Sequence, residues 1–404
     1  MRARGLAKFL PQFGWEPTIL TVRSNSTEEH PCRVVETPFE DVADKWKRRL
    51  GLNTGDPFKD QLGLRAPKNK NTATDLVLRV WEEAFCYPDS CVSWLESAIK
   101  EGEGLLRNEK FDAIVSTSPP ATIHLIACEL KRRSGVPWVA DFRDLWVQNH
   151  YFQRWWLRRV RERSLEVRTM SSADALVTVS EPLARKLSEL HGDGRCLSIP
   201  NGYDPDIVCH DATLRKDFNI VYAGVLYRGR RDPEPLLKVV RDLVSEGLVD
   251  SKDVIMDFYG NQERWLTEDV ARYGLQDMVR AHGVVPKEEV LEKERESQLL
   301  LLLMWDNPEE RGNYTGKVFE YLAAQRPILS LGGKDGVVAE LLERTGAGVT
   351  VTGYDEVREK VMELYSEYKS RGSVGYQGKM AEIERYNHKE MAKKYSEVLG
   401  RVSG

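Results

Sequence analysis

Short apolar runs rich in β-branched residues alternate along the chain with longer stretches whose apolar positions recur every three or four residues. Because strands that alternate with helices form βαβ units, this pattern predicts a parallel sheet. In the first half of the chain the predicted strands are "PTILTV" (17–22), "DAIVST" (112–117), "PWVADF" (137–142) and "ALVTVS" (175–180), and helical patterns follow the last three.

The alternation breaks once and then starts again. Pro, Gly and Asp crowd together at 197–217, and strand-like runs return at 218–224, 253–260, 299–305, 327–333 and 347–353. A chain of 404 residues is longer than a single hydrophobic core usually supports. We therefore expect an α/β protein with two doubly wound parallel-sheet domains, 1–204 and 205–381, and a C-terminal helix at 382–404 that crosses back to the first domain.

The start of the chain departs from this pattern. The segment "MRARGLAKFLPQFGWEPTIL" opens with helical spacing before any strand has occurred. The first strand of the N-terminal sheet is therefore expected to be missing. The polar stretch at 53–75 predicts a long loop, which in a compact domain is more often functional or mobile than structural.

Charge and cysteine content exclude several classes of protein. The formal net charge of -4 argues against a protein that binds nucleic acid with its whole surface, so we expect no nucleic-acid partner. The six cysteines form no CxxC pair and no cluster with metal spacing, which predicts neither a zinc site nor a disulfide framework. Since no run approaches about 18 apolar residues, we expect a cytoplasmic protein, with attachment to a membrane surface still open.

A basic loop follows the strand at 218–224. The strand ends at Gly224, a helix begins after Asp232 and Pro233, and Arg228, Arg230 and Arg231 lie between them. A strand-to-helix junction offers free backbone N–H groups and the positive end of the helix dipole, and guanidinium groups hold phosphate oxygens in pairs. The loop therefore favours a diphosphate site, and the alternative is a solvated loop in which Asp232 caps the helix.

The segment "NYTGKVFEYL" (313–322) has the same character. Thr315 and Gly316 allow close backbone approach at a helix start, Lys317 brings a cation, and Glu320 lies on nearly the same face. A lysine that contacts phosphate and a glutamate that accepts hydrogen bonds from a ribose would together recognise a nucleoside diphosphate. The alternative is an exposed Lys-Glu ion pair.

Two segments of the first half carry further candidates. "ADFRDLW" places Asp141, Arg143 and Asp144 at the carboxyl end of a predicted strand, where an acid beside an arginine could orient an acceptor hydroxyl, and the alternative is a structural Asp-Arg pair. The stretch 149–170 interleaves tryptophans with arginines, as suits the surface of an anionic bilayer. Its alternative is a solvated helix with a buried stripe of tryptophans.

The ordered set of motifs resembles a GT-B glycosyltransferase, closest to the retaining family 4 enzymes that use nucleotide sugars. The resemblance covers almost the whole chain, from "GLAKFLPQFGWEPTILT" through "WVADFRDLW", "IPNGYDP", "YAGVLYRGRRDPEPLL" and "AHGVVP" to "GKVFEYLAAQRPIL". It implies two domains that face a cleft. It also implies transfer from a nucleoside-diphosphate sugar to an acceptor hydroxyl, in assembly of a cell-surface polysaccharide, glycolipid or glycoprotein glycan.

The resemblance also assigns roles to residues. Arg228 or Arg230 and Lys317 would hold the diphosphate, Glu320 would bind the ribose, and the backbone near Gly283 would contact the base. It implies no metal and no cofactor, with retention of anomeric configuration and a glycan or lipid-linked acceptor. The family usually has a sugar-contacting glutamate eight residues before the ribose-binding one, and here that position is occupied by Gly312, with Glu309 and Glu310 close by.

Two other functions remain open at the level of sequence. A nucleotide-sugar epimerase on the same fold would need two acid/base groups around the sugar rather than an acceptor site. A non-catalytic sugar-nucleotide-binding or scaffold protein would fit Gly312 and the absent first strand.

Overall fold

The structure, a computed structural model, describes residues 2–23, 30–40, 86–151, 155–208 and 212–404. These residues divide into two compact units, each described here by itself. The first unit contains Ala3–Ile199 and Ala392–Gly404, and the second contains Pro200–Met391 together with Arg2. The loop predicted at 53–75 lies outside the described residues.

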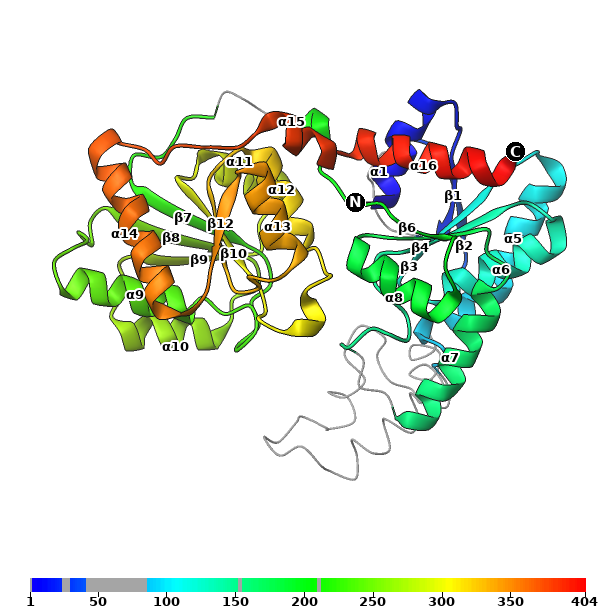
Figure 1. Cartoon of the computed structure of the whole chain (residues 1–404), viewed down its shortest axis with the longest axis horizontal. Helices are drawn as coiled ribbons and strands as arrows, with labels where there is room; N and C mark the ends of the chain where they lie inside the picture. Colours follow the sequence, from blue (N-terminus) through cyan, green and yellow to red (C-terminus); the bar gives the residue numbers. More distant parts are fainter. Residues whose placement is uncertain (1, 24–29, 41–85, 152–154, 209–211) are drawn as a thin grey trace. The chain divides into compact units, whose positions relative to one another are not determined.

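The first unit is built from parallel strands and the helices between them (Figure 1). A two-stranded sheet pairs β1 with β2, and a four-stranded sheet has the order β3-β4-β5-β6. Its strands are β1 (Thr18–Val22), β2 (Arg33–Thr37), β3 (Ile114–Ser118), β4 (Trp138–Phe142), β5 (Ala175–Thr178) and β6 (Cys196–Ser198). Its helices are α1 (Arg2–Phe9), α5 (Leu95–Asn108), α6 (Thr122–Ser134), α7 (Trp156–Met170), α8 (Glu181–His191) and most of α16 (His388–Ser403). The described chain thus begins with a helix, as the sequence predicts.

The second unit has one six-stranded parallel sheet of order β12-β11-β10-β7-β8-β9. Its strands are β7 (Phe218–Ala223), β8 (Val254–Tyr259), β9 (Val279–Gly283), β10 (Leu299–Leu303), β11 (Ile328–Leu331) and β12 (Gly348–Val351). Its helices are α9 (Glu234–Ser245), α10 (Arg264–Tyr273), α11 (Lys287–Glu296), α12 (Gly316–Ala324), α13 (Val337–Thr345), α14 (Gly353–Arg371) and α15 (Met380–Ile383).

Strand β10 shows why this sheet is covered on both faces. Its five residues are all leucine and all buried. Leu299, Leu301 and Leu303 pack in the core that α9, α10 and α14 share. Leu300 and Leu302 pack in the core that α12 and α13 share. Because successive side chains of a strand point to opposite faces, an unbroken apolar run marks a strand with helices on both sides (Figure 1).

The nine strands predicted from apolar runs are all present, and the structure adds β2, β6 and β9. The helix predicted over 382–404 is interrupted, because Asn387 ends one segment and its side-chain Oδ1 accepts a hydrogen bond from the Glu390 N–H at 2.8 Å, which starts α16. Residues Ala392–Gly404 of α16 belong to the first unit.

Candidate functional site

Three glycines line the carboxyl edge of the six-stranded sheet. Gly224 and Gly260 follow the neighbouring strands β7 and β8, and Gly283 ends β9; their φ angles are 145°, 138° and 79°. The Gly224 N–H donates to the Tyr259 carbonyl at 2.7 Å, and the Gly260 N–H donates to the Gly283 carbonyl at 2.8 Å. A Cβ on Gly260 would lie 2.2 Å from the Gly224 carbonyl oxygen. The place of a side chain at Gly260 is thus taken by the neighbouring backbone, so the ends of β7 and β8 pack directly against each other.

Lys317 lies directly on this glycine edge. A Cβ added to Gly224 would lie 1.9 Å from the Lys317 Nζ, so only glycine leaves room for the ammonium group. The same Nζ lies 5.7 Å from the centre of the Tyr222 ring. The fold thus brings together Gly224 and Lys317, two residues that the sequence predicts to bind a diphosphate.

The ammonium group of Lys317 is partly buried without an ion-pair partner. Within the described ranges no carboxylate oxygen lies within 4.0 Å of its Nζ. Burial lowers the pKa of Lys317, the nearby Glu320 and Glu294 charges oppose that shift, and Arg231 adds to it. A desolvated cation beside a second cation is an environment that favours binding of an anion.

Glu320 faces helix α11 rather than Lys317. Its Oε1 lies 3.1 Å from the Lys287 Nζ, at the start of α11. The alternative of a simple Lys317-Glu320 surface pair is therefore not what the structure shows. Thr315 precedes α12 without a side-chain cap, and a Cβ on Gly316 would meet no atom within 4 Å. The first turn of α12 is thus open to a ligand.

The arginines of the basic loop point to different partners. The Arg228 Nη2 lies 3.4 Å from the Asp269 Oδ1, and the Arg230 guanidinium lies 4.3 Å from the centre of the Trp305 ring. Asp232 holds the loop together and caps the following helix, since its carboxylate accepts from the Gly229 N–H at 2.8 Å and from the Glu234 N–H at 3.0 Å. The structure thus shows the helix cap by Asp232 that the sequence analysis gave as the alternative, and the same loop also carries its arginines.

Arg231 and Gly260 complete the edge. The sequence indicates Arg231 as one of three arginines in the basic loop without assigning it a contact, and Gly260 is not among the predicted site residues. Arg231 is the arginine of this loop whose charge acts on Lys317. The sequence gives three arginines within four positions, and only the turn that pairs Tyr227 with Arg231 decides which of them turns inward. Gly260 ends a predicted strand just as Gly224 does, so the repeated strand-glycine ending was the signal that could have found it.

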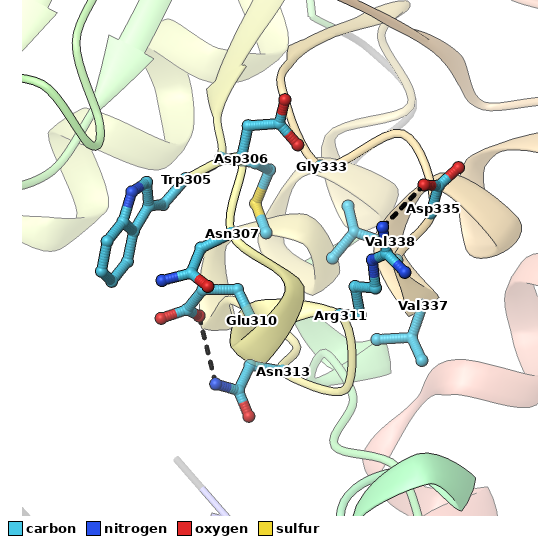
Figure 2. Close-up of a pocket in the computed structure, with 12 residues that line it drawn as sticks. Trp305, Asp306, Asn307, Glu310, Arg311, Asn313, Gly333, Asp335, Val337 and Val338 are labelled. Carbon is cyan, nitrogen blue, oxygen red and sulfur yellow. Dashed lines mark hydrogen bonds and ion pairs between the residues drawn. The ribbon is translucent and has the colours of Figure 1, made fainter. Parts of the chain in front are cut away.

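A pocket of about 300 Å³, including space open to solvent, lies at the carboxyl ends of β10 and β11 (Figure 2). Trp305, Asn307 and Glu310 come from the loop after β10, and Asp335 and Gly336 from the loop after β11. The Glu310 side chain is buried and its Oε2 accepts a hydrogen bond from the Asn313 Nδ2 at 3.1 Å. The cation-π contact of Arg230 with Trp305 connects this pocket to the basic loop.

The three acceptor-side candidates in the first unit have different environments. Asp141 is fully buried in β4, where its carboxylate accepts hydrogen bonds from the Thr117 Oγ1 at 2.7 Å and the Tyr395 hydroxyl at 2.6 Å. Arg143 is exposed and its guanidinium donates to the carbonyls of Ser118 and Pro119. Asp144 is exposed at the end of the strand. Asp141 thus fixes α16 to the sheet, and Asp144 is the acid that faces outward.

In the part of the chain that the structure describes, no three His, Cys, Asp or Glu side chains gather as metal ligands would. Within the same residues, no helix is both long and apolar enough to cross a membrane.

Comparison with known proteins places the chain among sugar-transferring proteins. Residues 1–202 match the family described as glycosyl transferase 4-like domain. No curated protein matches the chain. Among solved structures, sucrose-phosphate synthase from Thermosynechococcus elongatus is similar with a TM-score of 0.64 at 12% identity, covering 99% of this chain and 92% of that one.

Two further solved structures show the same likeness. HepE from Anabaena, in complex with UDP-glucose, has a TM-score of 0.58 at 13% identity, covering 95% of this chain and 99% of that one. A glycosyltransferase from Rickettsia africae has a TM-score of 0.59 at 12% identity, with 98% and 93% covered. At these identities the likeness is one of fold, and the fold is that of the GT-B glycosyltransferases.

Proposed function

This chain belongs to the glycosyl transferase 4-like family, and we propose that it is a nucleotide-sugar glycosyltransferase whose second unit holds the donor and whose first unit holds the acceptor. The comparisons give no support to an epimerase or to a non-catalytic scaffold. The observation that carries the proposal is the partly buried Lys317 ammonium group, which lies on Gly224 and has no carboxylate partner among the described residues.

The donor diphosphate is proposed to bind at the glycine edge. Lys317, Arg231 and the first turn of α12 supply positive charge there, and Gly224 leaves room for the Lys317 ammonium group that would contact the phosphates. Glu320 would then exchange its contact with Lys287 for hydrogen bonds from the ribose. The base would lie beside Gly283, whose φ of 79° turns the backbone at the end of β9.

The transferred sugar is proposed to occupy the pocket of Figure 2. Glu310 is buried in its lining and lies two residues before Gly312, the position at which the family usually has its sugar-contacting glutamate. We assign that contact to Glu310, because its carboxylate accepts hydrogen bonds as a sugar hydroxyl requires and is already positioned by Asn313.

The proposed reaction retains anomeric configuration and uses no metal ion. Charge develops on the departing diphosphate, and Lys317 with the neighbouring arginines would stabilise it in place of a metal. Asp144 is the acid that we assign to the acceptor hydroxyl, since Asp141 is committed to Thr117 and Tyr395. The acceptor is proposed to be a glycan or a lipid-linked glycan.

A thermal-shift series tests the donor proposal. UDP, GDP, ADP and their glucose conjugates are each added to the full chain in buffer with and without EDTA, and UDP comes first because the similar HepE structure contains UDP-glucose. Binding to the folded state raises the Tm by mass action. A ligand at 100 times its Kd adds about 2.7 kcal/mol to the free energy of unfolding. A Tm that none of these compounds moves would contradict the donor site, and a shift that EDTA abolishes would contradict binding without a metal.

Helix α7 supports a second proposal, attachment to the surface of an anionic membrane. Trp155, Trp156 and Val160 are 64%, 62% and 60% exposed, so the alternative of a buried tryptophan stripe does not hold. The buried face of α7 carries Glu162 and Glu166 instead. A helix with acids inside and tryptophans and arginines outside suits the boundary between lipid headgroups and acyl chains.

Vesicle sedimentation tests this attachment. The protein should bind vesicles that contain phosphatidylglycerol more tightly than vesicles of phosphatidylcholine alone, and added salt should weaken the binding. The double substitution Trp155→Ser with Trp156→Ser should reduce binding about tenfold or more, since each ring loses its interfacial burial. Leu248→Ser, which changes an exposed apolar residue of the second unit, is the matched control. Equal binding of the double variant and the wild type would contradict the proposal.

A further inference from the structure

Glu294 is a buried carboxyl group that the proposed donor site does not use. It lies near the end of α11 with 0% of its surface exposed. Neither of its carboxyl oxygens has a hydrogen-bond partner among the described residues. An ionised carboxylate without partners in a protein interior costs several kcal/mol. The uncharged, protonated form is therefore favoured, and burial raises the pKa of Glu294 to about 8.

Two of the charged groups that act on Glu294 belong to the proposed donor site. From α12, Glu320 raises its pKa further and Lys317 lowers it; from α11 itself, Lys287 and Arg295 lower it. The buried Tyr321 hydroxyl of α12 is also affected by the Glu294 charge. That hydroxyl accepts from the Ala223 N–H at 3.2 Å, next to Gly224, and donates to the Leu301 carbonyl at 3.1 Å. Glu294 is thus coupled to the helix that carries Lys317 and, through Tyr321, to the end of β7.

Lys317 and Glu294 also influence each other directly. Each lacks a partner of opposite charge within ion-pair distance among the described residues. The Glu294 charge opposes the lowering of the Lys317 pKa, and the Lys317 charge opposes the raising of the Glu294 pKa. Because the two groups interact, their protonation states are coupled, and a charge that binds beside one changes the proton affinity of both.

We propose that Glu294 is a proton-linked positioning residue of the donor site, which keeps its proton when a nucleoside diphosphate binds at Lys317 and, at the alkaline pH at which the free carboxyl group is ionised, takes one up from solvent. The proposal rests on the proposed function. The bound diphosphate adds negative charge near the carboxyl group, and a like charge favours its neutral form. When Glu294 is protonated, it carries no negative charge that would repel the diphosphate. The positive charge of Lys317 is then available to the phosphates. By linkage, nucleotide affinity falls as the pH rises through the range in which the free site loses that proton.

The first experiment measures the Kd of UDP, GDP and ADP between pH 7 and 9, where the phosphates are already ionised. We expect the affinity of the wild type to fall about tenfold over this range. Glu294→Gln keeps the shape and removes the titration, so its affinity should change less than threefold. Glu292→Gln removes an exposed carboxylate from the same helix and should follow the wild type.

The second experiment needs no nucleotide. A raised folded-state pKa means that the folded protein holds a proton that an unfolded glutamate releases, so stability falls as the pH rises from about 5 to about 8. Relative to Glu294→Gln, the unfolding equilibrium constant of the wild type should rise up to about tenfold per pH unit. Glu294→Met gives the same comparison should the glutamine variant fail to fold.

The outcomes separate the two proposals. If none of the three nucleotides binds, the donor site fails and this inference fails with it. Should a nucleotide bind with parallel pH profiles in the wild type and Glu294→Gln, the donor site stands and proton linkage is overturned. Parallel stability profiles without nucleotide would show that Glu294 is already ionised and would overturn the inference independently.

Discussion

Replacing Lys317 by methionine is expected to weaken nucleotide binding about 100-fold or more while leaving the second unit at least as stable as before. The ammonium group is the cation that lies on Gly224, and loss of one partner from a desolvated charge pair costs about 2–5 kcal/mol of binding free energy. In the free protein, however, that charge is partly buried without an ion pair, and its removal relieves a desolvation cost. Methionine also keeps the packing against Tyr222.

Calorimetric titration with the nucleotide that gives the largest thermal shift measures the loss, and the Tm without nucleotide measures stability. Lys369→Met is the matched control, because that lysine belongs to the same unit but pairs with Asp253 at the surface. An unchanged Kd in Lys317→Met, or the same loss in Lys369→Met, would remove Lys317 from the donor site.

Asp144→Asn is expected to slow sugar transfer about 100-fold or more without changing nucleotide affinity or Tm. Positioned acids and bases contribute about 10²- to 10⁴-fold to such reactions, and Asp144 is the exposed acid at the end of β4. The measurement is the rate at which the donor sugar is released to an acceptor or, without one, to water. The nucleotide Kd checks that the donor site in the second unit is intact.

Asp141→Asn provides the matched comparison, because it makes the same chemical change three positions earlier. In the wild type the Thr117 and Tyr395 hydroxyls each donate to one oxygen of Asp141. An asparagine has only one such oxygen, so one hydroxyl loses its acceptor, which should cost about 1–3 kcal/mol of stability. We therefore expect a lowered Tm in Asp141→Asn and a lowered rate in Asp144→Asn. The reverse assignment of the two effects would contradict the roles proposed here.

The fold could be predicted from the sequence wherever strands are buried on both faces. The five leucines of β10 and the apolar run at 218–224 are unambiguous because both faces of each strand lie against helices. The strand β9 was missed because it lies at the edge of its sheet and three of its five residues, Arg280, Ala281 and His282, are exposed. Edge strands carry less of the apolar pattern on which such predictions depend.

The candidate site was predictable in its residue types but not in its pairings. The sequence indicated a basic loop and a Lys-Glu segment, yet it could not show that Lys317 lies on Gly224 or that Glu320 turns to Lys287. These contacts join segments far apart in the chain, and spacing within one helix says nothing about them. The burial of Glu294 could not be predicted for the same reason, since the sequence "KEEVLEKERE" is typical of a helix that is exposed to solvent on all sides.

The membership of Ala392–Gly404 in the first unit has a consequence for exchanging units between relatives. Along the chain, the second unit is inserted between two parts of the first unit, so the two units are not simply consecutive domains. A chimaera that replaced everything after Ile199 would also remove Tyr395, the buried hydroxyl donor to Asp141. A second unit grafted from another glycosyltransferase should therefore replace 200–391 alone, so that the first unit keeps Ala392–Gly404, its own part of α16.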